Sequence, residues 1–325
     1  MDSLLWVGFI VLVVFLLALD LGLHKRRPQV LFLREALAWT GFYVTLAMLF
    51  CVFIYFVYEH NWLGAGVEWT RDLTGGEAAL RFFTAWLLEW SLSMDNIFVI
   101  ALIFAYFQVP APQQHRVLFW GILGALVFRA LMILAGVALL KRFEWIIYIF
   151  GALLLLTAIR MIAARHDNLR PHRNPIVQLC RKCLPLTEGF RGSAFLVREE
   201  SRLHATPLLL ALVVVETTDV VFAVDSIPAA FAVTTDPFLV LTSNIFAVLG
   251  LRALFFALAG LMTRFRFLKM SLVFILAFVG IKLLLSHHYQ IHTFASLAII
   301  AGFLSVGILA SLLYEDTAPL RPPPR

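Results

Sequence analysis

Long runs of apolar residues alternate with short polar segments over most of the chain. A helix needs roughly 20 apolar residues to cross the hydrocarbon core of a bilayer. The pattern predicts nine such helices, over residues 3–23, 36–58, 78–106, 116–140, 143–164, 205–230, 237–262, 269–288 and 293–314. The first run has no basic segment before it and no small-residue cleavage site after it, so we interpret it as a retained helix. The expected fold is an all-α polytopic membrane protein.

Composition indicates the same class of protein. Hydrophobic residues make up 62% of the 325 residues, charged residues make up 14%, and the mean hydropathy is +0.90. Soluble domains average about 45–50% apolar and about 25% charged residues. The net charge of +6 does not indicate a nucleic-acid partner, because the basic residues gather in alternate loops. The expected environment is the lipid bilayer.

The basic residues also predict which side of the membrane each loop faces. Eighteen of the 26 Lys and Arg residues fall in one alternating set of loops, and three fall in the other set. Cytoplasmic loops of membrane proteins carry an excess of Lys and Arg. The asymmetry predicts that the N-terminus lies outside and the C-terminus in the cytoplasm, which requires an odd number of spans.

Two of the predicted helices carry matching polar patterns. In EWSLSMDN, Glu89 and Asp95 are six residues apart, and in ETTDVVFAVDS the same spacing separates Asp219 and Asp225. An amide or hydroxyl residue follows each second acid, namely Asn96 and Ser226. The similarity continues from FRALMILAG and LRALFFALAG to the basic ends of LTAIR and FVGIK. Because the two segments enter the membrane from opposite sides, they predict an inverted repeat of three helices, an architecture found in transporters.

The repeat divides the chain into five parts. These are helices 1 and 2 (1–76), the first three-helix repeat (77–164), a basic cytoplasmic loop (165–204), the second repeat (205–290), and the last helix with a short cytoplasmic tail (291–325). The loop contains Cys180 and Cys183 as a lone C-x-x-C pair, which is a weak signal for a redox or soft-metal role.

Five acids lie inside the spans of the two repeats: Glu89, Asp95, Glu216, Asp219 and Asp225. Each charged acid costs roughly 2.5–3.5 kcal/mol at the bilayer centre. Four bases of the same repeats are candidate charge partners: Arg129, Arg160, Arg252 and Lys282. Salt bridges alone would explain the charges, but not the clustering of acids and amides on two related helices. Carboxylate, amide and carbonyl oxygens suit hard cations such as Mn²⁺, Mg²⁺ or Ca²⁺, so the pattern predicts an intramembrane cation site.

Helix geometry refines this prediction. Six residues turn a helix by about 240° and advance it by about 9 Å, so Glu89 and Asp95 cannot share one ion on a straight helix. Pro228 predicts a break in the helix over 205–230, and the segment SLS predicts a loosened helix over 78–106. The acids outnumber the bases, so one acid is expected to hold a proton until a cation binds. Glu216 is the leading candidate, because Trp86 occupies its position in the first repeat.

The segments EWSLSMDNIFVIALIF and ETTDVVFAVDSIPAAFAVTTDPFLVLTSNIFAVLGLRALFF resemble the TerC family of integral membrane proteins, in particular its Alx-type branch. The resemblance covers most of the chain. It implies manganese export across a bacterial-type inner membrane. The family's acidic positions would fall on Glu89, Asp95, Asn96, Glu216, Asp219 and Asp225, with Asn244 as a weaker candidate ligand.

The expected function is a secondary transporter that exports a divalent metal, with Mn²⁺ as the expected cargo, in exchange for protons. The sequence contains no P-loop, H-E-x-x-H or G-x-S-x-G motif, so we expect neither ATP-driven pumping nor hydrolysis, and no prosthetic group. One alternative is an assembly or insertion factor whose partners are exported proteins or the secretion machinery. Another is an intramembrane enzyme whose acids hold a catalytic metal.

Overall fold

The computed structural model describes residues 2–24, 33–60, 62, 73–143, 145–163, 185–187, 189–199, 202–259, 267–286 and 291–313. Its helices are α1 (Asp2–His24), α2 (Leu33–Glu59), α3 (Gly75–Phe107), α4 (Ala111–Arg142), α5 (Ile146–Ala163), α7 (Pro207–Phe231), α8 (Pro237–Leu249), α9 (Leu251–Ala259), α10 (Leu268–Leu285) and α11 (Thr293–Leu313). Each of the predicted ranges overlaps a helix, and the range 237–262 overlaps two.

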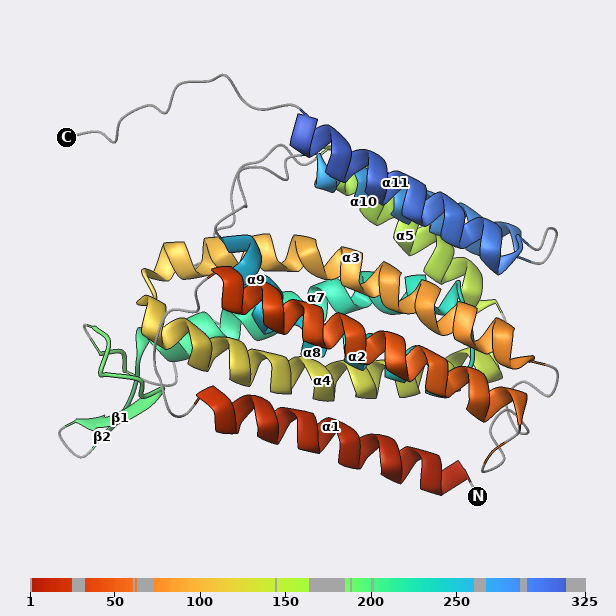
Figure 1. Cartoon of the computed structure of the whole chain (residues 1–325). Helices are drawn as coiled ribbons and strands as arrows, with labels where there is room; N and C mark the ends of the chain where they lie inside the picture. The colour runs from red at the N-terminus through yellow and green to blue at the C-terminus, as the bar shows by residue number, and fades with distance from the viewer. Residues whose placement is uncertain are drawn as a thin grey trace.

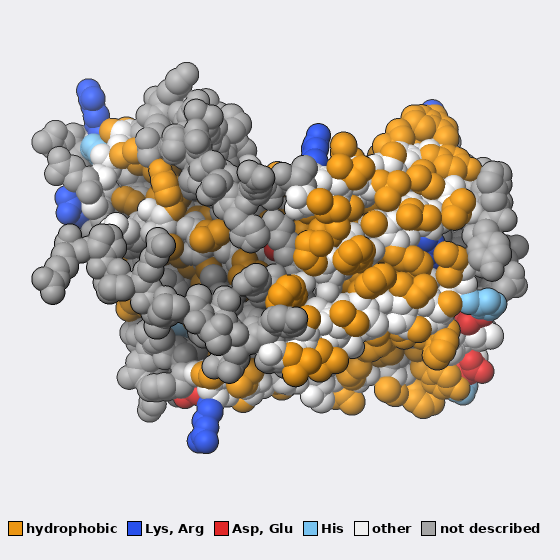
Figure 2. Space-filling view, turned by 90° about the horizontal axis from the view of Figure 1, so that it is seen from above, with side chains coloured by type: hydrophobic (Ala, Val, Ile, Leu, Met, Phe, Trp, Pro, Cys, Tyr) orange, Lys and Arg blue, Asp and Glu red, His pale blue; other side chains and the backbone are white. Residues whose placement is uncertain are grey.

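The helices have the lengths and surfaces of membrane spans. Within the described part of the chain, α2, α3, α4, α7 and α11 are each long and apolar enough to cross a bilayer. The pair α8 and α9, bent by 41° between them, makes a sixth span if it is counted as one, and α1, α5 and α10 contain shorter apolar helices. Hydrophobic side chains cover most of the described surface in Figure 2. The prediction of an all-α polytopic membrane protein is confirmed, while the side that each end faces stays a prediction.

The helices are arranged as two groups (Figure 1). The helices α5, α10 and α11 form one layer beside a bundle that contains α2, α3, α4, α7 and α8, with α1 on the far side. In the bundle, α3 and α7 run in opposite directions and pack against each other, α4 packs on α7, and α8 and α9 pack on α3. In the second group α5 packs on α10. A two-fold axis relating α3–α5 to α7–α10 would generate these pairs, which supports the interpretation as an inverted repeat.

The contact between α5 and α10 depends on two glycines. A Cβ atom added to Gly151 would lie 3.0 Å from the carbonyl oxygen of Gly280, and one added to Gly280 would lie 3.0 Å from the carbonyl oxygen of Gly151. Small residues let helix backbones approach closely where apolar side chains gain nothing by leaving lipid. The third helices of the two repeats are therefore joined at close range.

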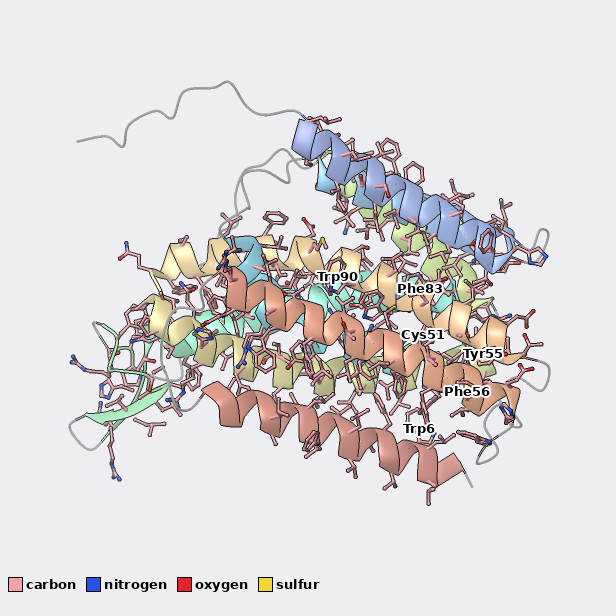
Figure 3. The ribbon with its side chains drawn as sticks, in the orientation of Figure 1. Trp6, Cys51, Tyr55, Phe56, Phe83 and Trp90 are labelled. Carbon is pink, nitrogen blue, oxygen red and sulfur yellow. The ribbon has the colours of Figure 1, made fainter. Side chains whose placement is uncertain are left out.

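The helix α8 forms the centre of the bundle, because all 13 of its residues are buried. Asp236 caps its N-terminus by accepting hydrogen bonds from the backbone N–H groups of Phe238 (2.9 Å) and Leu239 (3.2 Å). The hydroxyl of Tyr58 donates to the other oxygen of Asp236 at 2.8 Å. Trp6 lies on the side of α1 that faces the bundle (Figure 3), and its ring meets that of Phe238 at 5.2 Å between centroids. These contacts fix the register of α8.

The predicted breaks in the two acid-bearing helices are wrong. The helix α7 continues through Pro228 to Phe231, because the proline falls in the last turn, where only a few further residues follow it. The helix α3 continues through the segment SLS, where the hydroxyl of Ser91 donates to the carbonyl of Leu87 one turn earlier and so needs no partner outside its helix. The bend lies instead at Gly250, between α8 and α9.

The described part of the basic loop contains a short antiparallel hairpin of β1 (Leu196–Glu199) and β2 (Arg202–Ala205), with Leu196 opposite Ala205. Arg116, near the start of α4, donates to the hydroxyl of Ser193 at 2.8 Å, and its guanidinium lies 5.0 Å from the ring centroid of Phe195. The hairpin is thereby attached to the end of the bundle. Cys180 and Cys183 lie outside the described residues.

Candidate cation site

Arg129 of α4 lies at the centre of the predicted acids. The side chain is 2% exposed, which makes it one of the largest fully buried side chains of the described chain. Its Nε and Nη2 atoms donate to the two carboxylate oxygens of Asp219 on α7, at 3.1 and 3.0 Å. Its Nη1 atom forms an ion pair with Oε1 of Glu89 on α3. A bidentate contact of this kind is among the strong hydrogen bonds of proteins, and it offsets the cost of burying the charges.

Neutral side chains complete the surroundings of this ion-pair cluster. The Nη1 atom of Arg129 also donates to the hydroxyl of Ser226 at 3.4 Å and to the amide oxygen of Asn244 at 3.3 Å. The amide nitrogen of Asn96 donates to Asp219 at 2.9 Å. The cluster therefore joins α3, α4, α7 and α8. Arg129 bridges Glu89 and Asp219, the two acids that occupy equivalent positions in the repeats.

Three oxygens on α3 have no hydrogen-bond partner among the described residues. They are Oε2 of Glu89, Oγ of Ser93 and Oδ1 of Asn96, on side chains that are at most 2% exposed. The positions i, i+4 and i+7 lie on one face of a helix. More than about 90% of buried polar groups in proteins are hydrogen-bonded, and leaving one unpaired costs about 1–3 kcal/mol. Three such oxygens on one face indicate a place where a ligand binds.

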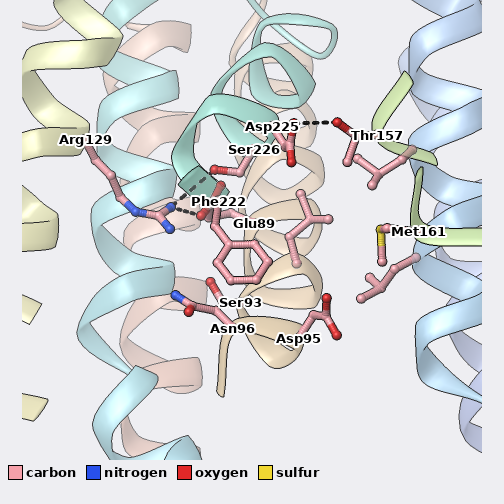
Figure 4. Close-up of a pocket in the computed structure, with 13 residues that line it drawn as sticks. Glu89, Ser93, Asp95, Asn96, Arg129, Thr157, Met161, Phe222, Asp225 and Ser226 are labelled. Carbon is pink, nitrogen blue, oxygen red and sulfur yellow. Dashed lines mark hydrogen bonds and ion pairs between the residues drawn. The ribbon is translucent and has the colours of Figure 1, made fainter. Parts of the chain in front are cut away.

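The same face of α3 lines a cavity of about 100 Å³ (Figure 4). Besides Arg129 and the three side chains of α3, its polar lining consists of Asp95, Asp225, Ser226 and Thr157. In Figure 4 Asp225 lies above and Asp95 below, with the ring of Phe222 at a height between the two. The hydroxyl of Thr157 on α5 donates to Asp225 at 2.7 Å. The cavity thus lies between the two groups of helices, with Met161, Leu272 and Leu276 on the side of α5 and α10.

A second, smaller cavity is also lined by Asn96. Its volume is about 20 Å³, and it is lined by Asn96, Asp219 and apolar residues of α3, α4, α7 and α9. Asn96 is common to both cavities. Asn96, which donates to Asp219, is therefore a shared wall of the two cavities.

The remaining predicted residues lie apart from this cluster. Glu216 is half-buried on α7, and its carboxylate lies directly against Gly124 of α4, in a space that any side chain at Gly124 would fill. Its Oε2 atom is buried without a partner among the described residues. Of the other predicted bases, Arg252 is buried on α9, Lys282 is half-buried on α10, and Arg160 is exposed near the end of α5.

The acids do not form a metal site by themselves. Within the described ranges, no group of three or more His, Cys, Asp or Glu side chains is close enough to hold a metal ion. The physical reason is that Arg129 lies between Glu89 and Asp219, while Asp95 and Asp225 approach the cavity from different helices. A cation in the cavity would need the neutral oxygens of α3, or a movement of the acids.

Sequence reasoning missed several residues of this region. Ser93 has the helical spacing that places it between Glu89 and Asn96, so its position on the acidic face could have been recognised. Thr157 and Phe222 gave no such signal, because their roles depend on how α5 and α7 pack. The contact of Glu216 with Gly124 likewise joins residues of different repeats.

The long apolar helices of the bundle are those of a multi-pass membrane protein, and the bundle contains a buried cluster of carboxylates around Arg129. The chain belongs to the TerC family: the family described as "Integral membrane protein TerC family" matches residues 74–318. With relatives in bacteria, it is an integral protein of the inner membrane.

The relatives match over nearly their whole length. An uncharacterized membrane protein of Myxococcus xanthus is 47% identical over 97% of this chain and 94% of its own. The "Putative membrane-bound redox modulator Alx" of Escherichia coli (strain K12) is 46% identical over 93% of this chain and 92% of its own. A membrane protein of Rickettsia felis is 40% identical over 96% of this chain and 98% of its own. No solved structure matches the chain.

Proposed function

We propose that this protein is a secondary transporter that exports a divalent metal cation, with Mn²⁺ as the favoured cargo. The observation that carries the proposal is the row of unpartnered buried oxygens of Glu89, Ser93 and Asn96, which line one cavity together with the carboxylates of Asp95 and Asp225. Buried oxygens without partners are stabilised by a cation that they can coordinate.

The charges of the region favour a divalent ion. The lining of the cavity and the ion-pair cluster contain the carboxylates of Glu89, Asp95, Asp219 and Asp225 and the guanidinium of Arg129, and the charge of Arg160 acts on Asp225. Four acids against these two bases leave an excess of negative charge when all are ionised. Protons and a cation compete for these carboxylates, so the uptake of a cation is expected to release protons, which is the physical basis for exchange.

The donor atoms favour a hard metal. The polar lining of the cavity offers carboxylate, hydroxyl and amide oxygens, with the thioether of Met161 as its sulfur atom. Oxygen donors suit Mn²⁺, Mg²⁺ and Ca²⁺, whereas Zn²⁺ and Cu⁺ are bound more often by imidazole and thiolate. The choice of Mn²⁺ and of the outward direction rests on the resemblance to the TerC family.

The test is metal flux in liposomes that contain the purified protein. Asp225→Asn and Asp95→Asn should each abolish Mn²⁺ flux, because each removes a charge from the wall of the cavity. Glu77→Gln is the matched control, since Glu77 is an exposed acid in the first turn of the same helix as Asp95 and should leave flux unchanged. If either aspartate variant, inserted at the normal level, transports as fast as the wild type, the cavity is not the transport site.

A further inference from the structure

The two oxygens of the Glu89 carboxylate have different surroundings. Oε1 accepts from Arg129, whereas Oε2 is buried without a partner among the described residues and Glu89 lines the cavity. Asp219, in contrast, uses both oxygens on Arg129 and also accepts from Asn96. Arg129 therefore has a two-point partner in Asp219 and a one-point partner in Glu89. Glu89 is the carboxylate that Arg129 and a cation in the cavity must share.

We infer that Arg129 is a specificity-determining residue. It stays paired with Glu89 in the presence of monovalent cations, and a divalent cation displaces it from Glu89. The inference rests on the proposed function and deepens it. A monovalent cation that replaces Arg129 at Glu89 exchanges one unit charge for another, so it gains no Coulomb energy to offset its lost hydration. A divalent cation has a larger hydration energy to lose, but it interacts twice as strongly with Glu89 and with the carboxylates of Asp95 and Asp225 in the same cavity, because Coulomb energy is proportional to charge.

Arg129 remains paired after this exchange. When a cation draws Glu89 away, the guanidinium keeps the bidentate contact with Asp219 and the hydrogen bonds to Ser226 and Asn244. Leaving a buried charge without a partner is strongly destabilising, so this second set of partners is a condition for the exchange. An arginine held by Glu89 alone could not release it.

The test measures how sodium affects Mn²⁺ binding to the purified protein in detergent. Free Mn²⁺ is followed by its electron paramagnetic resonance signal, in NaCl and in choline chloride of equal ionic strength. The wild type should bind Mn²⁺ with the same affinity in both salts. In Arg129→Gln, sodium should compete for Glu89 and weaken the apparent affinity by about tenfold or more relative to choline. Arg142→Gln, at the exposed end of the same helix, should behave as the wild type.

A second variant guards against loss of folding. Arg129→Gln combined with Asp219→Asn removes both charges of the bidentate pair, so that one buried acid, Glu89, instead of two is left without the guanidinium. It should show the same sodium competition, because Glu89 then has no guanidinium partner. The inference is overturned if sodium weakens Mn²⁺ binding in the wild type as much as in the variants, or if the variants are as insensitive to sodium as the wild type. A wild type that binds no divalent cation refutes the proposed function instead, and the inference with it.

Discussion

Asp219→Asn should destabilise the protein more than Glu89→Gln, although both substitutions remove one carboxylate from Arg129. All three side chains are at most 6% exposed, so solvent screens their interactions little. Asp219→Asn removes the bidentate partner and leaves the guanidinium with the one-point contact to Glu89. Breaking a buried ion pair in this way costs about 3–5 kcal/mol. Glu89→Gln keeps the bidentate pair and the contacts to Ser226 and Asn244, so its cost should be about 1–3 kcal/mol.

The assay is unfolding by dodecyl sulfate in mixed micelles, followed by far-ultraviolet circular dichroism. Glu77→Gln, at an exposed position of α3, controls for the loss of an acid and should have little effect. The order should reverse for Mn²⁺ binding, which Glu89→Gln should weaken more, because Glu89 lines the cavity and has an unpartnered oxygen. Equal destabilisation by the two substitutions, or a larger effect of Glu89→Gln, would refute the assignment of Asp219 as the main partner of Arg129.

Three further predictions concern proton coupling, packing and the cysteines. Mn²⁺ flux should increase with pH, because protons compete with the cation for carboxylates. Glu216→Gln should make the flux less dependent on pH. A wild type with pH-independent flux would exclude coupling between Mn²⁺ transport and proton release. Gly124→Ala should lower flux by displacing the Glu216 carboxylate that lies against Gly124. Gly41→Ala, at a position with open space around it, should leave flux unchanged. Flux equal to wild type in Gly124→Ala would show that the position of the Glu216 carboxylate is unimportant for transport. Replacing Cys180 and Cys183 with Ser should leave flux intact, and its loss would indicate a redox or soft-metal role.

The sequence was sufficient to predict the helices and the acids, because both depend on local patterns. Apolar runs of membrane length located every described helix, and the six-residue spacing of the acids located α3 and α7 as the helices of the site. The position of the bend could not be predicted from the proline. Pro228 ends α7 without breaking it, whereas the bend at Gly250 depends on how α8 and α9 pack on α3.

The partners within the site could not be predicted from the sequence. Four bases were candidate charge partners, and only tertiary packing brings Arg129 between Glu89 and Asp219. Ser93 is uncharged, so the pattern of intramembrane charges does not identify it. Its importance follows from the buried, unpartnered state of its oxygen and from the cavity beside it.

The most direct test of the account is the movement of metal by the purified protein alone. Liposomes that contain the wild type should take up Mn²⁺, and an equal concentration of Na⁺ in place of a divalent ion should not be transported. Uptake should be lost in Glu89→Gln and retained in Glu77→Gln. Liposomes with correctly inserted wild-type protein that take up no Mn²⁺, Mg²⁺ or Ca²⁺ beyond the rate of empty liposomes would contradict the claim that the buried carboxylates form a cation pathway.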